Sequence, residues 1–259
     1  MQLAPRIHRV GPDSIVNSYL VEESGEVTII DAGAPGLWKL VPGELAAMGR
    51  SLDDVLAIVL THGHTDHVGY AERARRERNW PVLVHEADEA LAKGEVPNPA
   101  KQGKTRPGAI ASFLWWALRH GLLRVPALTA VATYGDGATL DVPGAPRVVL
   151  VPGHTPGSAA LHLPAHDALF VGDAMATYAV TTGERGPRIA PFTADSLQAL
   201  ASLARLEHLD ARLVLPGHGD LFTSGASEAV RLAREAAAGA DRRTGGDQPR
   251  ERAGSRDSH

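Results

Sequence analysis

Thr61-His62-Gly63-His64-Thr65-Asp66-His67 directly follows an unbroken apolar run at residues 55–60. Short runs of this kind, bounded by polar residues, are typical of strands that are buried on both faces. On extended backbone, side chains two positions apart point to the same side. His62 and His64 can therefore converge on one metal ion, and Gly63 places no bulk between them.

The chain then turns into a predicted helix that runs to about residue 78, which directs Asp66 and His67 toward a second position. Four imidazole and carboxylate groups cannot complete two metal shells, so further ligands must come from other strand ends. Three residues have that context, each shortly after an apolar strand and a glycine: His154, Asp173 and His218.

Histidine is abundant in this sequence, with twelve residues, and cysteine is absent. Disulfides, thiolate ligands and a cysteine nucleophile are thereby excluded, and a metal must be held by imidazole and carboxylate alone. The remaining histidines lack the strand-end context (His8, His120, His166, His208 and His259) or lie near strand ends without an assigned role (His85 and His162).

The composition indicates a globular chain of 259 residues, 44% of them hydrophobic, with a net charge of −4. We expect one domain at residues 1–238 and a disordered tail at 239–259, where Gly, Arg, Asp and Ser dominate. The weak acidity argues against nucleic-acid and anionic-membrane partners. Because no signal peptide and no apolar run of about 18 residues is present, we expect a cytoplasmic protein.

The order of elements favours two packed sheets with helices outside. A hairpin is expected around Ser24-Gly25, and further strands, helices and strands follow without strict alternation. The expected strands are 14–22, 27–31, 55–60, 81–85, 147–151, 159–163, 168–171 and 213–215, and the expected helices are 35–48, 110–123, 194–206 and 224–238. This layout fits a two-sheet α/β (α+β) fold better than a doubly wound sheet.

Residues 93–130 interrupt this rhythm with several prolines and glycines, six basic residues and one acid. We interpret the segment as a basic, helical insertion, since it is too short to bury a core of its own. Its aromatic residues either form a lid over the site, favouring an amphiphilic or anionic substrate, or pack against the body or a partner in a homodimer. Trp115 and Trp116 are candidates for the substrate pocket.

Five motifs in a fixed order resemble those of the metallo-β-lactamase superfamily of metal-dependent hydrolases, across residues 7–222. They are Asp31-Ala-Gly33, Thr61–Gly69, Gly153-His-Thr-Pro-Gly-Ser158, Gly172-Asp-Ala174 and Pro216-Gly-His218. The resemblance implies an αββα four-layer sandwich with a dinuclear site along one edge.

By position, the resemblance also implies the ligand set. His62, His64 and His154 would hold the first metal, and Asp66, His67 and His218 the second. Asp173 would bridge the two metals, and Asp31 would orient ligands without binding metal.

The resemblance points to the glyoxalase II/lactonase-like branch. Class B β-lactamases generally carry Cys or Ser at the bridging position, whereas Asp173 is similar to thioesterases, lactonases and phosphodiesterases. Homoserine-lactone lactonases place a Tyr three residues after the bridging Asp. That position is Ala176 here, and Tyr178, two residues further on, is a candidate for the substrate pocket.

These residues predict a dinuclear metallohydrolase. Two divalent ions, two carboxylates and a bridging hydroxide leave about one net positive charge, which favours reactions in which oxygen gains negative charge. We expect a metal-bridging hydroxide to cleave an ester, thioester or lactone of a small-molecule substrate, with Asp66 as a ligand that also transfers a proton. Zinc is the expected metal, with iron or manganese as alternatives.

Three other functions remain open. The same ligands can hold a single Fe(II) and perform sulfur (persulfide) dioxygenation. A β-lactamase activity would need only the same hydroxide. A non-catalytic binding module of the same fold is the third alternative, although all seven candidate ligands are present.

Overall fold

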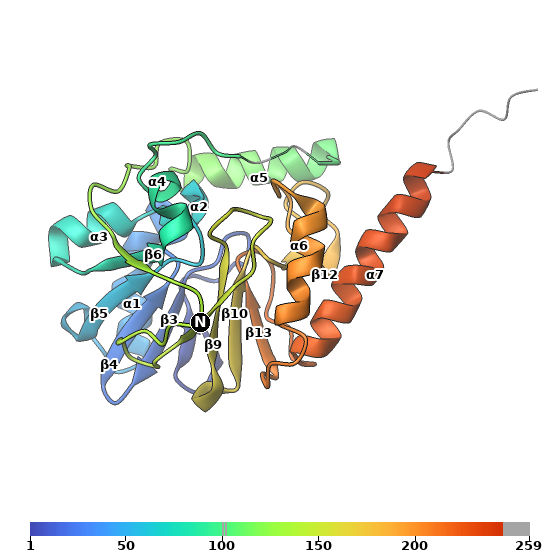
Figure 1. The fold of residues 1–259 in the computed structure, drawn as a ribbon. Helices are drawn as coiled ribbons and strands as arrows, with labels where there is room; N and C mark the ends of the chain where they lie inside the picture. The colour runs from blue at the N-terminus through green and yellow to red at the C-terminus, as the bar shows by residue number, and fades with distance from the viewer. Residues whose placement is uncertain (100, 102, 246–259) are drawn as a thin grey trace, which may run out of the picture.

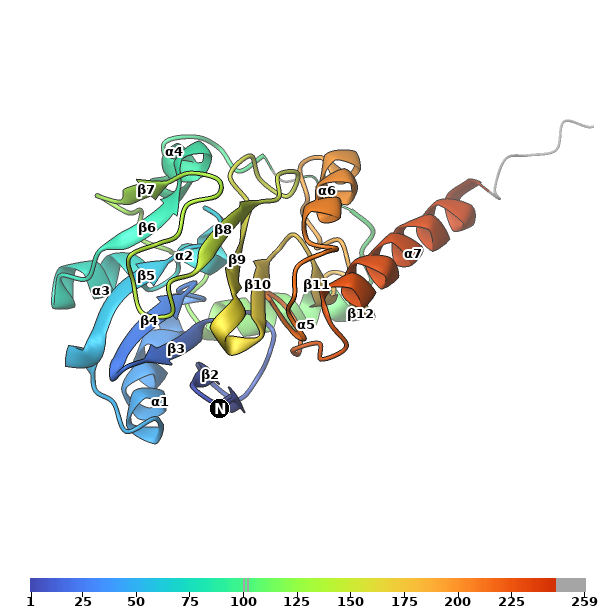
Figure 2. The ribbon, with the colours of Figure 1, turned by 60° about the horizontal axis from the view of Figure 1, so that its bottom comes forward.

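The computed structural model describes residues 1–99, 101 and 103–245. Two β-sheets pack face to face at the centre, and helices cover both outer faces (Figures 1 and 2). The protein therefore has the αββα four-layer sandwich that the sequence predicts.

The first sheet begins antiparallel and continues parallel. Its strands in the described chain are, in spatial order, β1 (Gln2–Ala4), β2 (Ile7–Arg9), β3 (Tyr19–Glu23), β4 (Glu26–Ile30), β5 (Val55–Val59), β6 (Val82–His85) and β7 (Ala132–Tyr134). β3 and β4 form the expected hairpin, because Ser24 and Gly25 both adopt positive φ angles, 54° and 94°. From β4 onward the strands pair parallel, so β4 and β5 end at the same edge.

The second sheet has the order β13-β10-β9-β8 among the described residues. These strands are β8 (Arg147–Leu150), β9 (Ala159–Leu163), β10 (Ala168–Gly172) and β13 (Leu213–Pro216), and a small separate hairpin consists of β11 (Ala176–Tyr178) and β12 (Arg185–Arg188). β9 is antiparallel to both β8 and β10, and β10 is parallel to β13. β8, β10 and β13 therefore all end at one edge, which is where the sequence places His154, Asp173 and His218.

The helices flank this core. The α-helices are α1 (Val41–Ala47), α2 (Thr65–Val68), α3 (Ala71–Arg78), α4 (Glu89–Ala92), α5 (Pro107–Arg119), α6 (Ser196–Ser202) and α7 (Ala226–Gly245). The 3₁₀ helices are η1 (Pro35–Leu40), η2 (Leu52–Asp54), η3 (Glu86–Asp88), η4 (Pro164–His166) and η5 (Leu203–Arg205). α5 lies across the top of the sandwich in Figure 1. Within the described ranges, no helix has the length and apolar character that crossing a bilayer requires.

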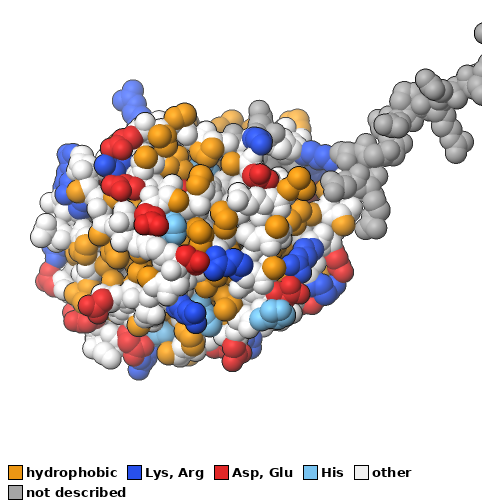
Figure 3. Space-filling model, viewed as in Figure 1, with side chains coloured by type: hydrophobic (Ala, Val, Ile, Leu, Met, Phe, Trp, Pro, Cys, Tyr) orange, Lys and Arg blue, Asp and Glu red, His pale blue; other side chains and the backbone are white. Residues whose placement is uncertain are grey.

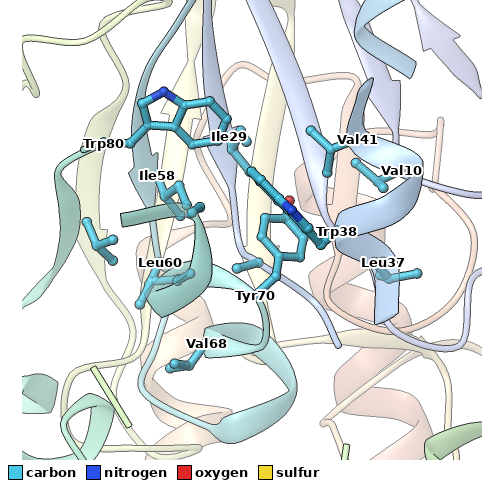
Figure 4. Close-up of a cluster of buried hydrophobic side chains, with 14 of the residues drawn as sticks. Val10, Ile29, Leu37, Trp38, Val41, Ile58, Leu60, Val68, Tyr70 and Trp80 are labelled. Atoms are coloured by element: carbon cyan, nitrogen blue, oxygen red, sulfur yellow. The ribbon is translucent and has the colours of Figure 1, made fainter. Parts of the chain in front are cut away.

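Alternate side chains of each strand enter different core layers, as the period of two demands. Ile29 packs with α1 and α3 outside the first sheet, whereas Ile30 faces the space between the sheets. In β10, Phe170 fills that central space and Leu169 packs outward toward α7. Figure 4 shows the outer cluster of the first sheet, built around Trp38, Tyr70 and Trp80. Three apolar layers thus hold four layers of structure together.

Two sequence expectations need correction. The expected helix at 35–48 is split into η1 and α1, since Pro42 lies at the start of α1 and lacks the backbone N–H of a helix interior. The prediction of disorder at 239–259 is wrong for residues 239–245, which continue α7. Ala and Arg around Gly239 favour helix strongly enough to carry the helix through it. Residues 246–259 of the expected tail lie outside the described residues.

Candidate metal centre

Strand ends and one short helix bring all seven candidate ligands to one edge of the sandwich. His62 and His64 lie between β5 and α2, and Asp66 and His67 lie on α2. The other three ligands follow strands of the second sheet: His154 after β8, Asp173 after β10 and His218 after β13. The two sheets therefore contribute from opposite sides of the same edge.

The candidate ligands form three overlapping groups whose ligand atoms lie within 4.8 Å of one another. These groups are His62, His64 and His154; His62, His67 and Asp173; and Asp66, His67 and His218. The first and third groups are the two triads that the resemblance implies. Asp173 lies between them, with Oδ2 at 3.3 Å from His154 Nε2 and 3.2 Å from His218 Nε2.

Several ligand atoms in this cluster fit a bound cation better than any protein partner. His62 Nε2, His67 Nε2 and Asp173 Oδ1 are buried and make no hydrogen bond within the described residues, and the last two atoms lie 3.5 Å apart as an ion pair. Leaving buried polar atoms unpaired is costly, and such atoms in native proteins usually bind a partner. Imidazole nitrogens and carboxylate oxygens are the ligand atoms that zinc and iron accept. The donor set is therefore suited to divalent metal ions.

Asp31 orients two of the rings without belonging to any of the three groups. Its Oδ2 accepts hydrogen bonds from His67 Nδ1 at 2.9 Å and from Thr61 Oγ1 at 2.8 Å. Because the Thr61 hydroxyl has given its only hydrogen to Asp31, its oxygen accepts from His62 Nδ1 at 3.1 Å. Both rings are thus fixed with Nδ1 protonated and Nε2 directed at the cluster.

Two further contacts fix His154 and His218 in the same way. Thr193 Oγ1 donates to the carbonyl of Ala190 at 2.8 Å and therefore accepts from His154 Nδ1 at 3.0 Å. His218 Nδ1 donates to the carbonyl oxygen of Ile15. Neither Thr193 nor Ile15 was identified from the sequence, because neither lies in a motif. Hydrogen bonds of this kind set the tautomer of ligating histidines.

The histidines of the cluster differ in charge, because burial and neighbouring carboxylates shift their pKa values in opposite directions. Burial lowers the pKa of His62 and His64, and it lowers the pKa of His154 to about 3. Burial would also disfavour charge on His67, but Asp31, Asp173 and Asp66 outweigh it and raise its pKa to about 9. In the metal-free protein a proton on His67 therefore provides positive charge that a metal ion would replace.

Close packing around the ligands depends on Gly217. A Cβ atom at this position would lie 2.2 Å from Asp173 Oδ1 and 2.5 Å from His67 Cε1. No side chain can occupy that space while both ligands keep their places. The sequence motif Pro216-Gly-His218 includes this glycine, but the reason that a glycine is needed there becomes visible only in the packing.

Asp88 joins the two loops that carry three of the ligands, and it was not identified from the sequence. It is fully buried at the end of η3 and accepts hydrogen bonds from the backbone N–H of Gly63 and Gly157 and from Thr155 Oγ1, at 2.6–2.8 Å. These donors flank His62, His64 and His154. Its place shortly after the end of β6 was the only indication in the sequence.

A cavity of about 270 Å³ opens beside the candidate ligands. Its lining consists of His64, Thr65, Asp66, Asn98, Phe113, Leu114, Ala117, Leu122, Leu123, His154, Asp173, Val180, Pro191, Phe192 and His218. Several of these residues come from the 93–130 segment, so this insertion forms one wall of the cavity.

The aromatic residues expected in the pocket lie elsewhere. Trp115 is 61% exposed and stacks with Arg119, and Tyr178 stacks with Arg185. Trp116 is buried in the outer core cluster of the first sheet, and its Nε1 donates to Asp13 at 3.2 Å. The prediction that these three residues line the pocket is wrong. α5 turns a face made by Phe113, Leu114 and Ala117 to the cavity, and Tyr178 lies on β11 outside the lining.

Comparison with known proteins agrees with this geometry. The pattern of the metallo-beta-lactamase superfamily matches residues 11–218. YflN of Bacillus subtilis (strain 168), named as a probable metallo-hydrolase, is 28% identical over 216 residues, covering 79% of this chain and 81% of YflN.

Two solved structures share the fold at similar identity. The metallo-beta-lactamase family protein TTHA1429 from Thermus thermophilus has a TM-score of 0.64 and 28% identity, covering 92% of this chain and 81% of that one. TTHA1623, solved in a di-iron-bound form, has a TM-score of 0.58 and 29% identity, covering 85% of this chain and 96% of that one. Since the family pattern spans most of the sequence and the fold agrees, the chain belongs to the metallo-β-lactamase superfamily.

Proposed function

We propose that this protein is a metal-dependent hydrolase that holds two divalent ions and cleaves an ester, thioester or lactone. Zinc is the metal that we propose first. The observation that carries the proposal is the set of three overlapping ligand groups, with Asp173 between the outer two. His62, His64 and His154 would hold one ion, and Asp66, His67 and His218 the other. A bound divalent ion supplies Lewis acidity and lowers the pKa of a coordinated water to about 7.

The protein's own groups orient the reactants and handle the proton. Asp66 lines the cavity, and its Oδ2 lies 3.4 Å from His218 Nε2. Burial alone would raise the pKa of Asp66, but His67 and His218 hold it well below its usual range. Asp66 is therefore ionised at neutral pH, which is the form that binds a metal ion. In our proposal it also carries a proton from the attacking water to the leaving group, as its place in the cavity allows.

The surface supports a small-molecule substrate. On the face shown in Figure 3, acidic and basic side chains are interspersed and form no continuous basic stripe. The net charge of −4 is also unfavourable for a polyanion. The cavity beside the ligands is of a size that suits a small organic group.

The test combines metal content with turnover. The wild-type protein should contain two metal ions per chain and hydrolyse at least one member of a panel of esters, thioesters and lactones. The double variant His62→Ala/His64→Ala should lose both properties, whereas His208→Ala, at an exposed histidine, should keep both. Full turnover by the double variant would overturn the proposal.

Iron is the alternative that an observation favours, because the similar protein TTHA1623 was solved with two irons bound. Protein purified without added metal distinguishes the candidates by its content. Two zinc or two iron ions per chain, with ester hydrolysis, support the hydrolase. One iron per chain, with oxygen uptake on a persulfide substrate, would instead establish a dioxygenase, and nitrocefin turnover would establish a β-lactamase.

A further inference from the structure

We propose that the cavity beside the metal centre binds an uncharged, apolar acyl group and discriminates against an anionic group of the same size. This inference rests on the proposed function, which supplies the bond that is cleaved. One water molecule occupies about 30 Å³ in the liquid, so the cavity of about 270 Å³ accommodates roughly ten non-hydrogen atoms.

The wall away from the candidate ligands is apolar. Eight of its lining side chains are hydrophobic, and no Lys or Arg belongs to the lining within the described chain. They are Phe113, Leu114, Ala117, Leu122, Leu123, Val180, Pro191 and Phe192. An anionic group placed here would lose its hydration without gaining a cationic partner, which is a costly exchange.

The basic residues of the insertion do not supply that partner. Arg106 forms an ion pair with Glu184 at 3.3 Å, and Arg119 lies over the exposed ring of Trp115. Neither arginine belongs to the cavity lining, although the basic composition of this segment favours an anionic substrate when the sequence is considered alone. Lys101 lines a neighbouring pocket that shares part of this wall, but it does not belong to the lining of the cavity either.

The apolar wall continues to the rim of the cavity. Leu114 is 53% exposed and Leu123 is 67% exposed, and both line the cavity. Apolar side chains that stay exposed beside a cavity are typical of a ligand-binding groove, because burial against a ligand recovers their hydrophobic free energy.

The apolar wall also contains a strained residue. Phe192 lines the cavity with φ at +62°, a backbone conformation that bulky residues rarely adopt. Such conformations persist where the surrounding structure enforces them, and they cluster at ligand sites. The strain indicates that the position of this ring matters more to the protein than local backbone stability.

The loop that carries Phe192 is also hydrogen-bonded to the loop that carries His154. Next to the ring, Thr193 Oγ1 accepts from His154 Nδ1 at 3.0 Å. The backbone N–H of Ala194 donates to the carbonyl of His154 at 3.2 Å, and that of Asp195 donates to the carbonyl of Gly153 at 2.8 Å. An acyl group packed against Phe192 would therefore lie at a fixed place relative to His154, which is the requirement for aligning its carbonyl with the metal centre.

The experiment compares two acyl groups of equal size on the metal-loaded protein. Ethyl hexanoate presents an apolar chain, and monoethyl succinate presents a carboxylate, with release of ethanol measured for both. We expect kcat/KM to favour the hexanoate by about tenfold or more. Equal rates, or a preference for the succinate ester, would overturn the inference while leaving the hydrolase function in place.

A matched pair of variants on α5 tests whether the wall of the cavity causes the preference for an apolar acyl group. Leu114→Lys introduces a cation at the rim and should reduce the preference for hexanoate by about tenfold. Leu118→Lys is the control, because Leu118 is similarly exposed, at 57%, on the same helix but does not line the cavity. If both variants change the ratio equally, the cavity is not the origin of the preference.

Binding without turnover separates this inference from the proposed function. Titration calorimetry on the metal-loaded protein should show tighter binding of hexanamide than of succinamate, and Leu114→Lys should remove the difference. If no ester, thioester or lactone is hydrolysed but hexanamide still binds preferentially, the hydrolase proposal fails and the apolar site stands. Equal binding of both amides would overturn the apolar site.

Discussion

His67 donates from Nδ1 to Oδ2 of Asp31 across 2.9 Å, and both side chains are almost completely buried. Asp31 directly follows β4, and His67 lies on α2, the short helix after the neighbouring parallel strand β5, so the shared edge of the sheet brings the two residues close together. Asp31 adopts a left-handed backbone conformation with φ at +57°. This conformation turns its carboxylate toward the ligand rings and tolerates only a few residue types well, Asn and Gly among them.

Asp31→Asn should weaken metal binding by about 10–100-fold, the usual cost of losing a hydrogen-bond partner behind a ligating histidine. Asn suits the left-handed backbone, so the variant should fold while losing the charge that holds His67. The measurement is a metal competition titration against a chelating dye at fixed pH. Asp167→Asn is the control, because Asp167 also has positive φ, at 52°, but contacts Arg212 at the surface. Unchanged affinity in the Asp31 variant would contradict the orienting role.

Gly217→Ala should abolish metal loading. Its Cβ would meet Asp173 Oδ1 at 2.2 Å and His67 Cε1 at 2.5 Å, so at least one ligand must move. Metal content after purification, together with the melting temperature with and without added zinc, measures the effect. Gly43→Ala provides the comparison, because a Cβ there meets nothing within 4 Å. That control lies within α1 and should gain about 0.5–1 kcal/mol of stability at most. Normal metal content in Gly217→Ala would show that the centre tolerates the displacement.

The convergence of the seven candidate ligands was predictable because their positions follow from the period of two in a strand and from the shared edge of parallel strands. His62 and His64 are two residues apart, and His154 and His218 follow strands whose apolar runs are visible in the sequence. Asp88 was not predictable, because its role depends on two loops that meet only in the folded protein. The face that α5 turns to the cavity was also hidden, since this helix is apolar on more than one side.

Glu72 gives the fold a pH-dependent contribution away from the metal centre. Its buried carboxylate accepts from Arg75 and Arg76 on its own helix and from Thr129 in the segment before β7. The hydrogen bond from Arg75, together with those from Thr129 and Arg76, outweighs burial and lowers the pKa of Glu72 from 4.5 to about 2. Because the folded protein favours the ionised form, the contribution is complete above about pH 4.5 and is lost as the pH falls toward 2.

Glu72→Gln should therefore reduce the free energy of unfolding by about 1–3 kcal/mol at neutral pH, since solvent screens the exposed Arg76, and by much less near pH 2. Urea unfolding at a series of pH values measures the difference between variant and wild type. Glu77→Gln is the control, because Glu77 is exposed on the same helix and pairs with Arg73 at the surface. A difference between Glu72→Gln and wild type that stays constant with pH would contradict the assignment.

Phe192 allows the strain in the cavity wall to be separated from the function of its ring. Phe192→Ala and Phe192→Gly both remove the ring, but only Gly is relaxed at φ of +62°. We expect the Gly variant to be more stable than the Ala variant by roughly 1 kcal/mol, because left-handed backbone is costly for residues with a Cβ. Both variants should lose the preference for an apolar acyl group to a similar extent. Urea unfolding and the ratio of hexanoate to succinate turnover measure these two effects separately. An Ala variant at least as stable as the Gly variant would mean that the backbone relaxes once the ring is gone, so that the ring itself maintains the strained turn.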